Sequence, residues 1–348
     1  MPKLSRLICL LGALWAAGFC LGCNSERAAT GNVRVGWQIP WATQGQVVQV
    51  LKHTTVLELN GLQAEFKGFS YGGPLNEAAL AGEVDVIFTA DQPAATLLAK
   101  GGKWTIVGRL MYNRVAIYVP PDSPIRSVAD LKGKRVAMPF GAAAQRDALK
   151  AIRESGLDPA GDITAINLDI YEQNNIVQKG DNKSWGEIDA LVGFDPTPAI
   201  FETKGMARML HVGVVVSLVL MSDSYLTTHP EDAQRFLQAL IQAWHYYATH
   251  QEQANAWFQQ ESRLQFDPAV LDITASVEPN IKARSVGDLR MLLNPDDLNT
   301  VQSAAKFIHD AGMAATEVSI SGHYNPNYMT AAWQRVMAAG EVEIRVKQ

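Results

Sequence analysis

Short apolar runs alternate with amphipathic stretches along most of this 348-residue chain. The runs are rich in Val, Ile and Phe, which favour strands, and the stretches between them have the apolar spacing of helices. Strands that alternate with helices form βαβ units around a parallel sheet, so the sequence predicts an α/β fold. Strands are expected at 33–37, 62–66, 84–88, 104–107, 115–119, 135–138, 163–167, 188–192 and 212–220, and helices at 46–57, 74–81, 93–100, 142–155, 171–179 and 196–203.

The alternation is interrupted at Pro120-Pro121-Asp122-Ser123-Pro124. Three prolines in five residues favour a stiff extended connector, and a second βαβ series follows it. After the apolar run 212–220 the chain becomes mainly helical, beginning with a helix that has Pro230 in its first turn and an apolar stripe that we interpret as core. Two α/β units are therefore expected, which agrees with the length of the chain.

The N-terminus has the pattern of an export signal. Lys3 and Arg6 precede an uncharged, mainly apolar run over residues 7–19. That run is shorter than the ~20 apolar residues that a membrane-spanning helix needs. We therefore expect residues 1–22 to be a signal peptide and the protein to act in the periplasm or cell envelope.

The end of this signal suggests a lipid anchor. Leu21-Gly22-Cys23 resembles the lipobox of bacterial lipoproteins, in which the cysteine is acylated, although Cys20 stands where that motif usually has Leu. We expect Cys23 to carry the lipid that attaches the protein to a membrane, and residues 23–32 to form a tether. An ordinary cleaved signal peptide is the alternative.

The composition excludes several classes of function. Cysteine occurs only at positions 9, 20 and 23, so the folded part is expected to have no disulfide and no zinc–cysteine site. Removing Lys3 and Arg6 changes the formal net charge from −5 to −7, which argues against a nucleic-acid surface. No metal-binding spacing of histidines, nucleophile motif or phosphate loop occurs. We expect a monomer without catalytic residues, metal or cofactor.

Four groups of segments resemble periplasmic substrate-binding proteins of ABC importers, in the branch with sulfonate-, taurine-, nitrate- and thiamine-precursor-binding proteins. The resemblance covers roughly residues 33–210, and the helical remainder fits by length. The segments are Val33-Arg34-Val35-Gly36-Trp37-Gln38; Gly73-Pro74 with Leu80-Ala81-Gly82-Glu83-Val84-Asp85-Val86; Ser123-Pro124-Ile125 with Ser127-Val128-Ala129-Asp130-Leu131-Lys132-Gly133-Lys134-Arg135-Val136-Ala137; and Ile188-Asp189-Ala190 through Phe194-Asp195-Pro196.

The resemblance implies a two-lobed periplasmic-binding-protein fold of type II. Each lobe would be a mainly parallel sheet flanked by helices, with the ligand in the cleft between the lobes. The chain would cross between lobes near Val119-Pro120 and near 212–216, so that lobe 1 combines residues 33–119 and 217–348 and lobe 2 holds 120–216. The protein would capture a small solute and deliver it to the permease subunits of an importer.

The residues themselves point to the same cleft. In open α/β sheets, ligands bind beyond the carboxyl ends of the strands, where helix N-termini present free N–H groups. Several short loops occupy such positions, and Gly or Pro fixes the backbone at each. The candidate ligand-binding residues are Gln38, Pro40, Trp41, Thr43, Gly72, Thr89, Asp91, Gln92, Phe140, Gly141, Ala142, Phe194 and Asp195.

Some of these candidates have a structural alternative. Asp91 and Asp195 are also natural caps for the helices that follow at Pro93 and Pro196. Phe140 fits packing between the lobes as well as ligand stacking. These alternatives stay open at the level of sequence.

The type of ligand is less constrained. Relatives that hold sulfonates tend to have hydroxyls where this chain has Ala142-Ala143-Ala144. Two acids, Asp91 and Asp195, and two aromatic residues, Trp41 and Phe140, suit a cation or a planar heterocycle better than a bare tetrahedral anion. The candidate solutes are a sulfonate, nitrate, a pyrimidine-like compound, or an aromatic or amine compound, with a preference for an apolar or ring portion. A sensor lipoprotein that partners a membrane signalling protein, and an enzyme of pyrimidine or quinone-precursor synthesis, are the rival functions.

Overall fold

The computed structural model describes residues 31–347. The predicted signal peptide, Cys23 and all of the predicted tether except residues 31 and 32 lie outside the described residues. The first strand begins at Gly31, so residues 31 and 32 belong to the sheet. Within the described part, no helix has the length and apolarity that crossing a membrane requires.

One mixed sheet of eight strands runs through the whole molecule, in the order β2-β1-β3-β8-β4-β7-β5-β6. The strands at its two ends are parallel, β2-β1-β3 in one group and β7-β5-β6 in the other. The central strands β8 and β4 are antiparallel to each other and to their outer neighbours. The strands are β1 (Gly31–Gln38), β2 (Leu62–Phe69), β3 (Val86–Ala90), β4 (Trp104–Val119), β5 (Lys134–Met138), β6 (Ile163–Asn167), β7 (Ala190–Phe194) and β8 (Arg208–Ser222).

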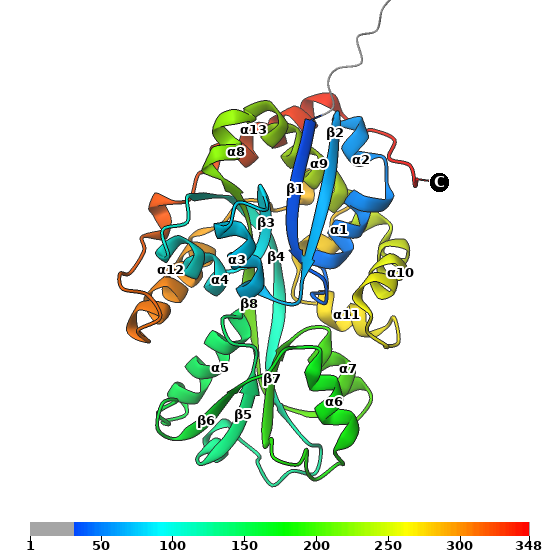
Figure 1. Cartoon of the computed structure of the whole chain (residues 1–348). Helices are drawn as coiled ribbons and strands as arrows, with labels where there is room; N and C mark the ends of the chain where they lie inside the picture. The colour runs from blue at the N-terminus through cyan, green and yellow to red at the C-terminus, as the bar shows by residue number, and fades with distance from the viewer. Residues whose placement is uncertain (1–30, 348) are drawn as a thin grey trace, which may run out of the picture.

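Figure 1 shows two lobes, one above the other, joined by β4 and β8. Lobe 1 is the upper body, which contains β1–β3, and lobe 2 is the lower body, which contains β5–β7. The helices are α1 (Gln44–His53), α2 (Val56–Leu59), α3 (Gly72–Leu80), α4 (Asp91–Ala99), α5 (Ala143–Glu154), α6 (Glu172–Lys179), α7 (Thr197–Thr203), α8 (Asp223–Thr228), α9 (Pro230–Thr249), α10 (Gln251–Ser262), α11 (Val270–Ala275), α12 (Pro295–Asp310) and α13 (Asn327–Ala339).

The first crossing between the lobes differs from the prediction. The two strands expected at 104–107 and 115–119 are one strand of sixteen residues, β4. Its second half, Val115 to Tyr118, pairs with β7 and therefore belongs to lobe 2. The predicted crossing near Val119-Pro120 is wrong because the chain changes lobe several residues earlier, inside β4. β8 passes between the lobes beside it, pairing with β3 from Ser217 onward.

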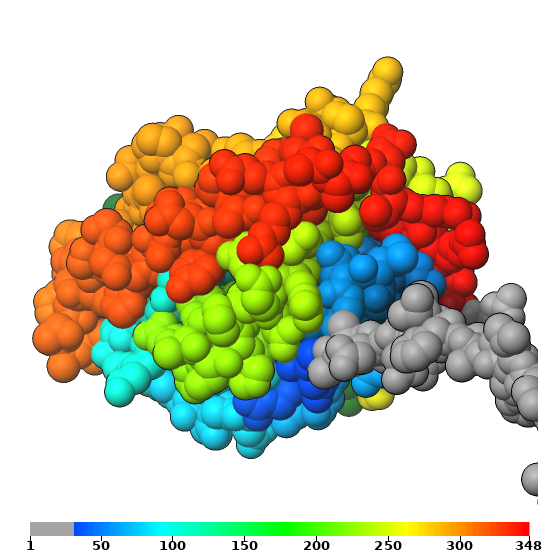
Figure 2. All heavy atoms as spheres, turned by 90° about the horizontal axis from the view of Figure 1, so that it is seen from above, coloured from blue at the N-terminus to red at the C-terminus, as the bar shows by residue number. Residues whose placement is uncertain are grey.

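Helices cover both faces of lobe 1. α1, α9 and α10 pack together on one face and α3, α4 and α12 on the other. The apolar stripe of α9 is core, because Phe236, Leu240, Trp244 and Tyr247 are almost completely buried. Seen from above, the C-terminal segment with α13 lies beside α8 and α9, and its end lies close to α2 (Figure 2).

The C-terminal segment also explains why the helix expected at 46–57 is divided. α1 ends at His53, and Thr54 has an extended backbone. The N–H of Thr55 donates to the carbonyl of Arg345 at 2.8 Å, and the N–H of Lys347 donates to the carbonyl of His53 at 2.8 Å. These contacts take the place of helical hydrogen bonds between α1 and α2, so the break depends on a segment almost 300 residues away.

Candidate functional site

Helices begin at the carboxyl ends of strands in both lobes, and the loops there touch across the junction. α1, α3 and α4 follow β1, β2 and β3 in lobe 1, whereas α5 and α7 follow β5 and β7 in lobe 2. The N–H of Ala42 donates to the carbonyl of Asp195 at 3.3 Å. A Cβ atom built on Gly73 would lie 3.7 Å from the carbonyl oxygen of Phe140. The predicted loops of the two lobes are therefore brought together.

Trp41 and Phe194 form an aromatic contact between the lobes. Their ring centroids are 5.9 Å apart with the planes at 62°, an edge-to-face arrangement. Both are buried, and so is Pro40. Thr43, two residues after Trp41 in the same loop, has φ +70° and ψ −53°. Such a backbone is costly for a residue with a Cβ, by about 1–3 kcal/mol, and is typical of ligand-binding loops.

Asp91 makes contacts in both lobes, and its predicted contact with a ligand stays a prediction. Its Oδ1 accepts a hydrogen bond from the N–H of Gln92 at 2.6 Å, within the first turn of α4, but Asp91 is the first residue of this helix and not its N-cap. Its Oδ2 lies 2.7 Å from Nη2 of Arg146, in the first turn of α5 in lobe 2. Burial raises the pKa of Asp91, and the charge of Arg146 opposes that shift. The carboxylate is therefore used between the lobes as well as within α4.

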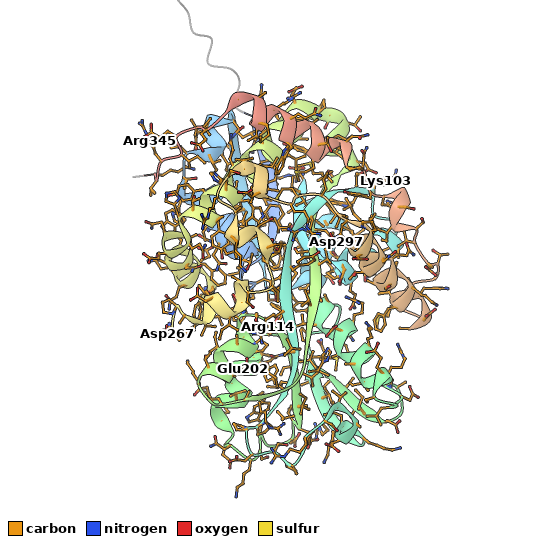
Figure 3. The ribbon with its side chains drawn as sticks, turned by 180° about the vertical axis from the view of Figure 1, so that it is seen from behind. Lys103, Arg114, Glu202, Asp267, Asp297 and Arg345 are labelled. Atoms are coloured by element: carbon orange, nitrogen blue, oxygen red, sulfur yellow. The ribbon has the colours of Figure 1, made fainter. Side chains whose placement is uncertain are left out.

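Asp195 is buried beside a positive charge. Its Oδ1 accepts from the N–H of Ala199 at 3.2 Å, which caps α7, and its Oδ2 lies 3.5 Å from Nε of Arg114. Burial raises the pKa of Asp195 to about 7, although the Arg114 guanidinium opposes the shift. Arg114 also pairs with Glu202 of α7, and Figure 3 shows both residues near the junction of the lobes.

These surroundings change the expected charge of the site. One acid is paired with Arg146, and the other is close to half-protonated at neutral pH. The preference for a cationic ligand, which the sequence predicts from Asp91 and Asp195, is not supported by this arrangement. Two arginines, Arg114 and Arg146, make the junction more suitable for an anion than the sequence suggests.

Buried polar atoms without a hydrogen-bond partner are concentrated in these loops. Each belongs to a side chain that is at most 6% exposed. Buried polar groups in folded proteins are nearly always hydrogen-bonded, so a group of exceptions in one place indicates a binding site. Within residues 31–347, the atoms without a partner at the junction are Gln38 Nε2, Trp41 Nε1, Thr43 Oγ1, Gln44 Nε2, Thr89 Oγ1, Gln92 Oε1, Asn113 Oδ1, Arg146 Nε, Asp195 Oδ2 and Thr197 Oγ1.

The remaining predicted residues have different roles. Gly72 is required by packing, because a Cβ there would lie 2.5 Å from Cβ of Pro93. Gly141 has φ +83°, which favours glycine. Ala142 is buried and precedes α5. Phe140 is 39% exposed, so its ring is not part of the buried group.

The sequence interpretation missed Gln44, Asn113, Gln145, Arg146 and Thr197. Asn113 lies in the middle of β4, and its Nδ2 donates to the carbonyl of Ala42 at 3.3 Å. In the sequence, Arg146 comes two residues after Ala142-Ala143-Ala144. Its position in the first turn of a helix that begins at the cleft is the signal from which Arg146 could have been predicted.

No group of three or more His, Cys, Asp or Glu side chains is arranged to hold a metal in the part of the chain that the structure describes.

Comparison with known proteins agrees with this architecture. The profile of the NMT1/THI5-like family matches residues 60–254. A candidate aliphatic sulfonates-binding protein of Escherichia coli (strain K12) is 28% identical over 241 residues, which cover 67% of this chain and 70% of that protein.

Two solved structures show the range of proteins with this fold. The alkanesulfonate-binding protein SsuA of Xanthomonas axonopodis pv. citri, bound to MOPS, has a TM-score of 0.70 and 23% identity over 86% of this chain and 99% of its own. The desulfurization enzyme DszB, as a cysteine-to-serine mutant with biphenyl-2-sulfinic acid, has a TM-score of 0.66 and 13% identity over 88% of this chain and 100% of its own.

The predicted two-lobed α/β fold of periplasmic binding proteins is thus confirmed. The profile match covers more than half of the sequence. The chain belongs to the NMT1/THI5-like family.

Proposed function

We propose that this chain is the substrate-binding component of an ABC importer and that it captures a small organic sulfonate between its lobes. The observation that carries this proposal is the set of buried hydrogen-bond donors without partners at the lobe junction. Two of them, Trp41 Nε1 and Arg146 Nε, can only donate hydrogen bonds. A ligand that satisfies them must present acceptors.

A sulfonate group fits these donors. It carries one negative charge and three oxygens that accept hydrogen bonds, and it has no proton to donate at neutral pH. Arg114 and Arg146 supply positive charge, and the first turns of several helices supply free N–H groups and the positive ends of their dipoles. The missing hydroxyls at Ala142-Ala143-Ala144 are compensated by Thr89 and Thr197, whose hydroxyls have no partner among the described residues.

An organic portion of the ligand is supported by the aromatic contact between the lobes. Trp41 and Phe194 present ring faces and edges beside the polar group. The sulfonate relatives named above favour the same class of ligand. Within the proposal, the lobes close around one sulfonate, the closed form docks on a membrane permease, and acylation of Cys23 keeps the protein in the cell envelope near that permease.

The proposal includes no chemical step. The sequence contains no cysteine from Asn24 to its end, so the folded lobes have no thiolate nucleophile. A bound alkanesulfonate is therefore expected to be recovered unchanged after prolonged incubation, as mass spectrometry would measure. Release of sulfite or sulfate at a rate proportional to protein concentration would contradict this.

Calorimetry with matched ligands tests the proposed ligand class. Butane-1-sulfonate and MOPS are expected to bind with a stoichiometry of one, whereas pentanoate and butylamine, which have a similar apolar portion, are expected to bind much more weakly. Preference for the amine, or for neutral heterocycles over both sulfonates, would overturn the proposal.

Replacing Trp41 with Phe is expected to weaken butane-1-sulfonate binding by about 10-fold or more, because hydrogen bonds to charged groups contribute about 1.5–3 kcal/mol. The variant keeps an aromatic ring against Phe194 and removes only the indole N–H. Trp185→Phe is the matched control, since Trp185 is equally buried but packs on Tyr118 in the core of lobe 2. Equal affinities of the two variants would show that the Trp41 N–H does not contact the ligand.

A further inference from the structure

Asp91 and Arg146 form a buried ion pair between the two lobes. Asp91 begins α4 in lobe 1, and Arg146 lies in the first turn of α5 in lobe 2. The side chains of Asp91 and Arg146 are 0% and 7% exposed. Oδ2 of Asp91 also accepts a weak hydrogen bond from the N–H of Val216 at 3.4 Å. Val216 belongs to β8 where that strand passes between the lobes, so one carboxylate contacts both lobes and a connecting strand.

A second polar contact lies beside the first. Nε2 of Gln92, the residue after Asp91, is 3.5 Å from Oε1 of Gln145, the residue before Arg146. The same Oε1 accepts from the N–H of Gly141 at 2.8 Å, which fixes the side chain of Gln145 against its own loop. The first turns of α4 and α5 therefore meet through two adjacent pairs of side chains.

The charges of the ion pair matter because the contact is made only when the lobes meet. Lobes that move apart would expose both groups to water, whereas in the structure both are removed from it. Removing an ion from water is costly, and the cost is compensated only if the opposite charge is present with good geometry. Loss of one partner leaves an uncompensated charge in the closed form, but the open form loses little.

We propose that the Asp91–Arg146 pair is a closing contact of this protein, whose matched charges set how much of the closed form is populated. Ligand affinity then depends on the pair through closure, because a ligand that binds the closed form binds more weakly when that form is rare. The dependence of affinity rests on the proposed function, whereas the effect on closure does not.

The closure can be measured without ligand by distances between spin labels. Glu83 in lobe 1 and Glu187 in lobe 2 are exposed and suit the two labels, introduced as Glu83→Cys and Glu187→Cys. Native cysteines occur only at positions 9, 20 and 23, so replacing these with Ser leaves only the introduced thiols. The labelled chain is compared with its Asp91→Asn and Arg146→Gln variants and with the double variant.

Each single variant is expected to shift the label distances toward an open form, and the double variant is expected to return toward the parent distribution. Asn at position 91 keeps one acceptor oxygen, which can retain the 2.6 Å hydrogen bond from the N–H of Gln92, and it loses the charge and the weak 3.4 Å contact with the N–H of Val216. Lys150→Gln is the control on the same helix, because Lys150 forms an exposed pair with Glu154 and should leave the distances unchanged. Single variants with the parent distribution, or a double variant more open than either, would overturn the proposal.

Binding of butane-1-sulfonate gives the second measurement. Asp91→Asn removes no donor from the site, so a loss of affinity of about 10-fold in this variant would report closure rather than a lost ligand contact. An unchanged affinity together with an open distribution would contradict the link to affinity. If the parent protein binds no sulfonate, the proposed function fails, but the ligand-free distances still decide whether the pair controls closure.

Discussion

Replacing Glu278 with Gln is expected to lower the free energy of unfolding by about 3–5 kcal/mol, because it leaves a buried guanidinium without its counter-charge. Glu278 and Arg109 are both 0% exposed. The carboxylate accepts from Nη1 and Nη2 of Arg109 at 2.6 and 3.0 Å, and from the N–H of Tyr112 at 2.6 Å. Among residues 31–347, the other acceptor of Arg109 is the carbonyl of Arg290, which carries no full charge.

The location of this pair adds to its importance. Arg109 and Tyr112 lie in β4 just before that strand passes to lobe 2. The hydroxyl of Tyr112 contacts Asp297 at the start of α12, whose position above the junction is marked in Figure 3. Glu278 therefore holds the end of β4 that belongs to lobe 1. Its loss is expected to loosen the connection between the lobes as well as the core.

Urea unfolding followed by circular dichroism measures the effect. Glu231→Gln is the matched control, since Glu231 pairs with Arg335 at 2.9 Å but the two side chains are 65% and 46% exposed. Exposed pairs contribute at most about 1 kcal/mol. Similar losses in the two variants would show that the buried pair at Arg109 has no special weight.

The stability gained from Asp195→Asn is expected to grow as pH rises from about 4 to about 7. In the folded protein the pKa of Asp195 is raised by burial to about 7, whereas the unfolded chain has an ordinary carboxyl pKa near 3.8. Between these values the folded state binds more protons, so the contribution of Asp195 to stability falls with rising pH. The slope is at most about 1.4 kcal/mol per pH unit. Above pH 7 the Asp195 carboxyl is ionised in both the folded and the unfolded state, so the full cost of burying its charge remains.

The comparison of wild type and Asp195→Asn isolates this contribution. Other acids, such as Asp130, have pKa values lowered by hydrogen bonds and act in the opposite direction in both proteins. Urea unfolding at pH 5, 6, 7 and 8 should therefore show an increasing advantage of the variant up to about pH 7 and a constant one beyond. A difference that does not change with pH would mean that Asp195 is ionised throughout. Glu202→Gln serves as a second probe, because removing that negative charge should move the window to lower pH.

The local pattern of the sequence was sufficient for most of the βαβ order. β6 lies at the predicted residues, since 163–167 is an isolated β-rich run between polar segments. β4 was predicted as two strands, 104–107 and 115–119, and Arg109, Asn113 and Arg114 lie between them. Their partners are Glu278, the carbonyl of Ala42 and Asp195, which no local pattern reveals. Polar residues in a central strand were therefore a sign of long-range pairing and not of a loop.

The candidate site was predictable in its loops but not in its charges. Strand ends followed by helix starts identified the loops that contain Trp41, Asp91 and Asp195. The net charge of the site depends also on Arg114 and Arg146, which contact Asp195 and Asp91 from other elements. Spacing along one chain segment carries no information about such partners, so a site predicted as acidic is balanced by arginines in the folded protein.

The two long central strands also determine how the protein can be divided. β4 and β8 supply sheet partners to both lobes, and they pair with each other from Trp104 to Val119. A cut on either side of this ladder would leave one fragment with an open sheet edge and without two of its strands. No single break in the backbone separates the lobes into complete folding units. Evolutionary exchange of one lobe, and laboratory fusion of lobes from different relatives, would therefore have to replace segments of both strands together.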